Sequence, residues 1–196
     1  MDSSESPTYG EQEGSAYNGH FGCPCNHPLF VFNQLGDLER CTLRSGNVHS
    51  ADGWRAVLEP VIARYRGMVK RRYFRGDAAF ANPEICGFLE AEGMGYAIRL
   101  PANRVLQDKI GYLLKRPAGR PPHEVRRYYA SFSASAIRRR AGKSRGVRRV
   151  VAKVEWHPVE RYPRVGVIVT KLARPAEGVV AFYNQRSTAE QWIKIL

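Results

Sequence analysis

The order of the hydrophobic patterns along the chain is the feature that most constrains its fold. Short apolar or alternating runs predict strands, whereas recurrence at helical spacing predicts helices. In chain order, the patterns predict a hairpin over 27–45, a helix over 51–66 with Ser50 as its N-cap, a strand over 69–74, a helix over 83–91 and a strand over 95–100. A hairpin followed by a β-α-β unit is typical of a mixed α/β sheet flanked by helices.

Residues 103–176 have a different character, because they are strongly basic and interrupted by prolines. Three extended stretches, over 125–133, 149–156 and 164–171, predict an antiparallel β insertion. The apolar positions after 178 recur at helical spacing, so a last helix is expected over 179–196.

The complete order matches an RNase H-like α/β fold, a mixed sheet flanked by helices with an antiparallel β insertion before the last helix. Only the end of the first strand is present, at Met1 and Asp2, and residues 3–26 are expected to form a loop. The expected domains are a first part of the core over 1–102, a basic insertion over 103–176 and a helix over 177–196 that completes the core.

The charge of the chain is unevenly distributed. Residues 1–60 contain eight acidic and three basic side chains, whereas residues 61–196 contain ten acidic and 28 basic ones. Residues 99–153 alone contain sixteen Lys and Arg against two acids. Such a region suits a polyanion, because neutralising phosphates releases their counterions. A solvated basic face, a membrane surface or a ribosomal partner is the plainer alternative.

No secretory signal is present, and apolar runs such as 165–170 are too short to span a bilayer. We therefore expect a cytoplasmic protein with reduced thiols at Cys23, Cys25, Cys41 and Cys86.

Three acidic residues are candidates for metal-assisted phosphoryl transfer, which needs carboxylates that converge from different elements. Asp77 follows a predicted strand, Glu190 shares a predicted helix face with Tyr183 and Arg186, and Asp2 is close to the N-terminus. The plainer interpretations are a turn residue for Asp77, a surface ion pair for Glu190 and a disordered polar terminus for Asp2.

Together these residues resemble a known family. The spacing Tyr183-x-x-Arg186-x-x-x-Glu190 resembles the Y-R-E-K signature of DDE-type insertion-sequence transposases. Further stretches that resemble one branch of this family are Tyr9–His20, His27–Asn33, Gly46–Ser50 and Leu100–Asn103. The resemblance extends over nearly the whole chain.

The resemblance implies an enzyme that cuts and joins double-stranded DNA during transposition of a bacterial insertion sequence. In this family three acids hold two Mg²⁺ or Mn²⁺ ions, and they correspond to Asp2, Asp77 and Glu190. Tyr183 and Arg186 would contact DNA phosphates near the cut. The implied partners are transposon ends and target DNA, with a homodimer possible in the DNA complex.

Two departures from the family pattern concern the ends of the chain. The signature Lys would fall at position 197, one past Leu196, and almost nothing precedes Asp2. We therefore expect a piece truncated at both ends, with low or no transposase activity. The alternative is a non-catalytic, basic nucleic-acid-binding module of RNase H-like shape.

Four further features carry weaker hypotheses. The cluster of Arg138, Arg139, Arg140 and Lys143 is expected to bind phosphates without reading sequence. The stretch 115–122 resembles a hook for the minor groove or a flexible basic loop. Trp156 would stack on an unpaired base or belong to the core. Four residues could form a zinc site or a loop with two buried thiols: His20, Cys23, Cys25 and His27.

Overall fold

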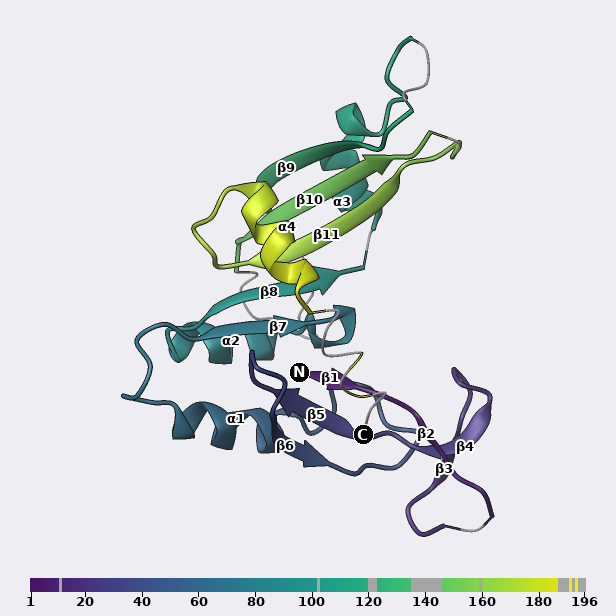
Figure 1. Cartoon of the computed structure of the whole chain (residues 1–196), viewed down its shortest axis with the longest axis vertical. Helices are drawn as coiled ribbons and strands as arrows, with labels where there is room; N and C mark the ends of the chain where they lie inside the picture. Colours follow the sequence, from purple (N-terminus) through teal and green to yellow (C-terminus); the bar gives the residue numbers. More distant parts are fainter. Residues whose placement is uncertain are drawn as a thin grey trace. The chain divides into compact units, whose positions relative to one another are not determined.

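The computed structural model of the chain describes residues 1–10, 12–101, 103–119, 123–134, 146–158, 160–186, 191 and 193. The chain divides into two compact units (Figure 1). The first unit consists of Met1–Arg72 and Arg186–Leu196, and the second unit consists of Tyr73–Gln185. No helix within the described ranges is long and apolar enough to cross a membrane.

The first unit contains the predicted hairpin and helix. Its main sheet has the order β1-β5-β6 and is antiparallel throughout. The bounds are β1 Asp2–Ser3, β5 Leu29–Phe32, β6 Leu38–Thr42 and α1 Trp54–Arg64. Helix α1 lies against β5 and β6 and buries one apolar face. The hairpin and the helix predicted from periodicity are therefore confirmed.

The start of α1 differs from the expectation. Gly53, at φ 68°, is the N-cap instead of Ser50. The reason is a tertiary contact, because Arg44 Nη1 donates to the backbone oxygens of Ser50 at 3.1 Å and Asp52 at 2.6 Å. Arg44 Nε also donates to the backbone oxygen of His27 at 2.8 Å. These bonds hold the residues before Gly53 in a turn, so the helix begins later than its sequence signal.

Residues 3–26 form more structure than the expected loop. They contain a small antiparallel sheet of order β2-β4-β3, with bounds β2 Ser6–Pro7, β3 Ala16–Asn18 and β4 Cys23–Asn26. Gly46 packs against this sheet so closely that a Cβ there would clash with the backbone oxygens of Cys25 and Ala16. Asn18 Nδ2 donates to the Gly46 oxygen at 2.5 Å. The sheet escaped prediction because long-range backbone contacts hold it and no alternating apolar face marks it.

The second unit is built on one five-stranded sheet of order β7-β8-β11-β10-β9. Strands β7 and β8 are parallel and the other pairs are antiparallel. The strands are β7 Tyr73–Gly76, β8 Gly95–Leu100, β9 Arg126–Ala134, β10 Arg148–Trp156 and β11 Arg164–Thr170. The helices are α2 Pro83–Ala91, α3 Arg104–Lys109 and α4 Ala176–Asn184, with 3₁₀ turns η1 Ala78–Phe80 and η2 Gly111–Leu113. A mixed α/β architecture is thus confirmed.

The three extended stretches predicted in the basic region are confirmed as β9, β10 and β11. They continue the sheet of β7 and β8, since β11 pairs with β8 from Val167↔Leu100 to Thr170↔Ala97. The strand expected over 69–74 instead begins at Tyr73, and Val69 is 45% exposed. Strand β7 therefore ends directly before Asp77.

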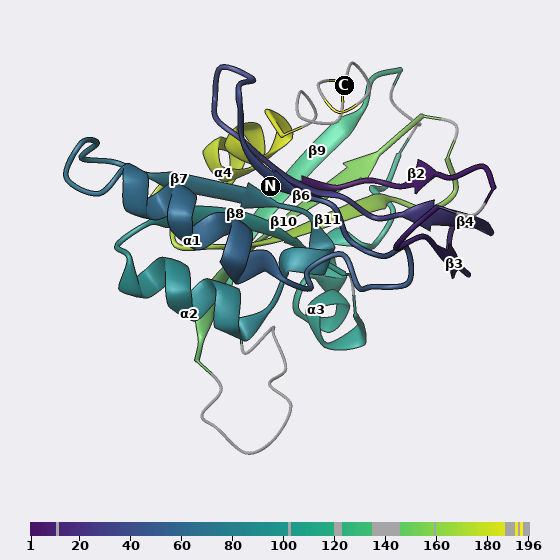
Figure 2. The same cartoon turned by 90° about the horizontal axis from the view of Figure 1, so that it is seen from below.

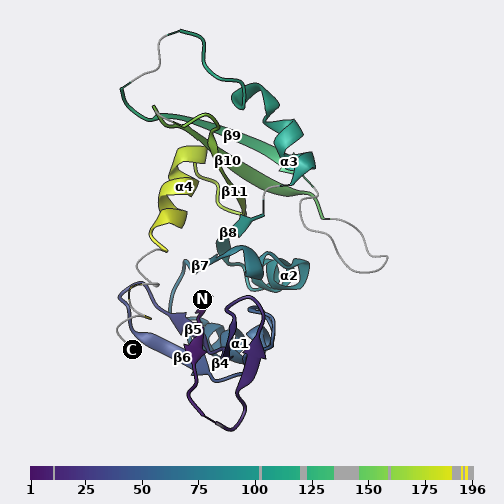
Figure 3. The same cartoon turned by 90° about the vertical axis from the view of Figure 1, so that its right-hand side faces the viewer.

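Both faces of this sheet are covered by helices. Figures 2 and 3 show α4 on one face, with α2 and α3 on the other. Under α4, Val179 and Val180 pack on Val151 and Ile168. On the opposite face, Trp156 belongs to a second apolar cluster, is 6% exposed and donates its Nε1 hydrogen to the Leu113 oxygen at 3.2 Å. Trp156 is thus a core residue, and its indole is not available to stack on a base.

Candidate active site

Asp2 is buried on the short strand β1. It is 4% exposed and pairs with Phe30 of β5. Its Oδ1 accepts a hydrogen bond from the Ser3 backbone at 3.0 Å, and its Oδ2 lies 2.6 Å from Arg186 Nη2. The interpretation of Asp2 as part of a disordered polar terminus is therefore wrong.

The Asp2–Arg186 ion pair joins two residues that are far apart in the sequence. Both side chains are largely buried, with 12% of Arg186 and 6% of Asp2 exposed. Charges removed from water need a partner, because the desolvation of an isolated buried ion is large. The observed partner of Arg186 is a carboxylate, whereas its expected contact with a DNA phosphate remains a prediction.

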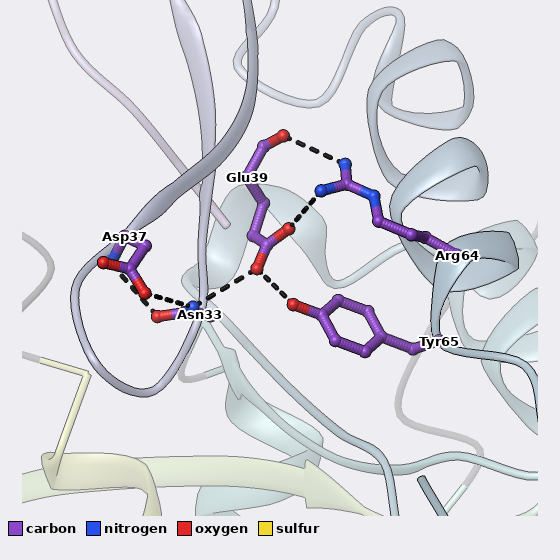
Figure 4. Close-up of polar contacts among 5 residues, drawn as sticks. All are labelled: Asn33, Asp37, Glu39, Arg64 and Tyr65. Atoms are coloured by element: carbon purple, nitrogen blue, oxygen red, sulfur yellow. Dashed lines mark hydrogen bonds and ion pairs between the residues drawn. The ribbon is translucent and has the colours of Figure 1, made fainter. Parts of the chain in front are cut away.

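A second polar network fastens the hairpin of the first unit to α1 (Figure 4). Glu39, on β6, accepts hydrogen bonds from Arg64 Nη1 at 2.8 Å, from Asn33 Nδ2 at 3.2 Å and from the Tyr65 hydroxyl. The hydrogen bond to Glu39 and burial raise the pKa of Tyr65. This network supports β5, the strand that pairs with β1 and therefore with Asp2. Glu39 carries no signal in the sequence, because no local pattern marks which acid of a strand will meet a helix.

Asp77 caps a tight turn at the end of β7. Its Oδ1 accepts a hydrogen bond from the Ala79 backbone at 3.0 Å, and it begins the 3₁₀ turn η1. A Cβ at Gly76 would lie 3.0 Å from Phe74 Cε1 and 3.1 Å from Phe80 Cβ. Two buried phenylalanines thus fix the backbone that presents Asp77, whose predicted place at a strand end is confirmed. Asp77 belongs to the second unit and Asp2 to the first.

The last helix differs from the expectation in its bounds. Helix α4 begins at Ala176 and ends at Asn184, with Gln185 as its C-cap. Arg186 is therefore outside the helix, and the expectation that it shares a helical face with Tyr183 is wrong. Tyr183 is partly buried and packs against the apolar cluster beneath α4. The remaining predicted site residues lie outside the described residues: Arg138, Arg139, Arg140, Lys143 and Glu190.

A cluster of cations and aromatic rings joins β7 to the end of α4 within the second unit. Arg75 lies 5.0 Å from the Phe182 ring centroid, and its Nη1 donates to the Phe182 oxygen at 3.3 Å. Arg174 lies 5.4 Å from the same ring, and Tyr73 meets it edge-on at 5.6 Å. Burial lowers the pKa of Arg75. Arg75 thus connects the strand of Asp77 with the helix that carries Tyr183.

Another acid, Glu90 on α2, is paired within the second unit. Arg148 donates to it through Nε at 2.8 Å and Nη2 at 3.2 Å, and the Tyr96 hydroxyl donates at 2.7 Å. Burial alone would raise the pKa of Glu90, but the bonds from Arg148 and Tyr96 lower it. Nearby, burial raises the pKa of Cys86 to about 11. The geometry is that of a structural ion pair, which sequence reasoning did not single out.

The zinc hypothesis gains no support from the geometry. In the part of the chain that the structure describes, no group of three or more His, Cys, Asp or Glu residues could hold a metal ion. His27 is 3% exposed and its Nδ1 lies 3.1 Å from the Val48 oxygen. Cys25 is fully buried, and burial raises its pKa. The expectation of a buried thiol is therefore confirmed for Cys25, whereas Cys23 is only partly buried.

Comparison with known proteins identifies one family. The sequence model of the family described as "Transposase DDE domain group 1" matches residues 1–196 of this chain. A search of curated proteins gave no match. The family match covers the whole chain, including both Asp2 and the final residues that follow α4.

Proposed function

Because the chain belongs to the family of transposase DDE domains, group 1, we propose that it cuts and joins DNA strands during transposition of an insertion sequence. Asp2, Asp77 and Glu190 are the proposed catalytic acids. The observation that carries the proposal is the family match over the whole chain. The burial of Asp2 on β1 and the place of Asp77 directly after β7 support it.

The proposed metal ligands suit a hard divalent cation. All three are carboxylates, and oxygen ligands are those that Mg²⁺ and Mn²⁺ prefer. Held by these carboxylates, such ions would supply the positive charge that stabilises the attacking and leaving oxygens of a phosphodiester. The chain itself holds two of these carboxylates in place. Arg186 and the Ser3 backbone orient Asp2, and the Ala79 backbone orients Asp77.

The second unit supplies the charge for a DNA partner. It contains 21 Lys and Arg against nine Asp and Glu. We propose that Arg138, Arg139, Arg140 and Lys143 bind backbone phosphates, and that Tyr183 and Arg186 act nearer the cut. Affinity should then fall steeply with salt, because phosphate contacts release counterions. A homodimer in the DNA complex is part of the same proposal.

The order of the elements along the chain supports an RNase H-like core. The first unit provides three antiparallel strands followed by α1, and the second begins with the parallel pair β7 and β8 around α2. We propose that these elements and α4 form the catalytic core. Strands β9 to β11 are then the basic β-rich addition to it.

The test is cleavage of duplex DNA that carries the ends of the element, with Mg²⁺ or Mn²⁺ and with EDTA. We expect weak, metal-dependent cleavage that Asp77→Asn lowers by about 100-fold or more, since misplaced or missing catalytic groups cost rate on that order. Asp108→Asn is the matched control, because Asp108 is an exposed acid on α3 of the same unit. Full activity of Asp77→Asn would contradict the assigned site.

A non-catalytic DNA-binding module is the second candidate, and the charge of the second unit favours it. The same experiment separates the two functions. Duplex binding with no metal-dependent cleavage, in both Mg²⁺ and Mn²⁺, would favour the binding module.

A further inference from the structure

One pocket of the second unit lies where three segments meet, two of which contribute an Arg. It is lined by the loop after η2, the first residue of β9 and the residues that follow β10. The lining residues are Arg116, Pro117, Gly119, Arg126, Trp156, His157, Pro158 and Glu160. Residues 116, 117 and 119 belong to the basic stretch 115–122, for which the catalytic proposal has no role.

The charges in this pocket are unbalanced. Among the described residues, neither Arg116 nor Arg126 has an ion-pair partner, and Arg126 is exposed. The pocket's one acid, Glu160, is already paired with Arg164, whose Nε donates to it at 3.0 Å. That hydrogen bond lowers the pKa of Glu160, so it stays ionised and bound to Arg164. Two guanidinium groups therefore face the pocket without a neutralising carboxylate.

One polar atom of the pocket also lacks a partner within the described residues. His157 Nε2 is buried and makes no hydrogen bond in the described part of the chain. A buried polar nitrogen without a partner is unfavourable by about 1–3 kcal/mol, so such atoms usually mark a site for water or a ligand. The neighbouring Trp156 is not the partner of His157 Nε2, because its Nε1 donates its hydrogen to the Leu113 oxygen.

We propose that this pocket binds a backbone phosphate of duplex DNA through Arg116, Arg126 and His157. Guanidinium groups bind phosphate oxygens with paired, charge-assisted hydrogen bonds, and a ring N–H of His157 supplies a further donor. Pro117 and Pro158 give the pocket rigid apolar walls, which offer no base-specific hydrogen bonds. The pocket thus anchors DNA without reading its sequence, outside the three catalytic acids.

This inference rests on the proposed function only for the presence of DNA, and its test needs no catalysis. Binding of the full chain to a duplex is measured in EDTA over a range of salt concentrations. The variant Arg116→Gln/Arg126→Gln should reduce the slope of log affinity against log salt by about 1, because the two side chains hold one phosphate and each phosphate contact contributes about 0.9. His157→Gln should weaken binding by roughly 2- to 10-fold with little change in slope.

The matched control is Arg99→Gln/Lys171→Gln, which removes the same charge from two exposed positions of the second unit. An equal loss of slope in this control would overturn the proposal, since only total charge would matter. Circular dichroism checks that each variant is folded.

The remaining outcomes separate this inference from the catalytic proposal. If the wild-type chain cleaves DNA and the Arg116→Gln/Arg126→Gln variant shows the wild-type slope of log affinity against log salt, the pocket inference is wrong and the catalytic proposal stands. If inorganic phosphate binds at the pocket but the pocket variant binds duplex normally, the pocket holds free phosphate and the DNA assignment is overturned. A wild-type chain that binds no DNA would contradict both proposals.

Discussion

The two units of this chain are stabilised in different ways. Residues 1–72 carry eight Lys and Arg and eight Asp and Glu, and polar contacts such as those of Glu39 and Asn18 add to the apolar face of α1 in holding their two small sheets. The second unit carries 21 Lys and Arg against nine acids, yet its single sheet has apolar clusters on both faces. The first unit uses charge internally to hold an acid in place. The second unit has an apolar interior and a large excess of positive charge, which suits the proposed DNA partner.

The largest expected effect tests whether a polar pair really holds the first unit together. Arg186→Met removes the guanidinium that pairs with the buried Asp2 carboxylate, so it should destabilise the chain by about 3–5 kcal/mol. Asp2→Asn added to Arg186→Met removes that charge and should recover most of the loss. Denaturant unfolding of wild type, both single variants and the double variant measures the coupling. Additive losses would mean that the pair contributes little.

A steric change in the first unit should have the next largest effect. Gly46→Ala places a Cβ against the backbone oxygens of Cys25 and Ala16, which cannot move aside as a flexible side chain can. We expect a loss of about 3 kcal/mol, at the upper end for overpacking. Gly87→Ala on α2 is the control, because a Cβ there meets nothing within 4 Å. Faster amide hydrogen exchange in β3 and β4 should locate the loss of stability in Gly46→Ala. Equal stability of the two variants would contradict the predicted clash.

The smallest effect concerns the Glu90–Arg148 pair of the second unit and its dependence on pH. The folded-state pKa of Glu90 is lowered from 4.5, so its contribution to stability is present above that value and is lost as the pH falls below it. Glu90→Gln should lower stability at pH 7 and flatten the pH dependence below about 4.5. Unfolding at pH 3 to 7 measures this difference. Parallel pH profiles of wild type and variant would show that the Arg148 contact does not stabilise the fold.

The sequence was sufficient where the structure depends on neighbouring residues. Helix α2 begins after Asn82, whose Oδ1 accepts from the Glu84 backbone at 2.8 Å, and Pro83 occupies its first turn. These are local signals, and the predicted helix is confirmed. Strand β8 was predicted over its full length, because Gly93, Pro101 and a run of apolar residues define it without reference to the rest of the chain. The family, and through it Asp2 and Asp77 as candidates, also followed from short motifs.

Only the tertiary structure decided the features that depend on distant residues. No pattern near Asp2 indicates that β5 would bury it or that Arg186 would become its partner. The start of α1 after Gly53 depends on Arg44, and α4 ends at Asn184, before Arg186, which pairs with Asp2. The phosphate pocket likewise combines segments around Arg116, Arg126 and His157. Local energies select helices and strands, whereas the pairing of buried charges depends on which surfaces meet after the chain has folded.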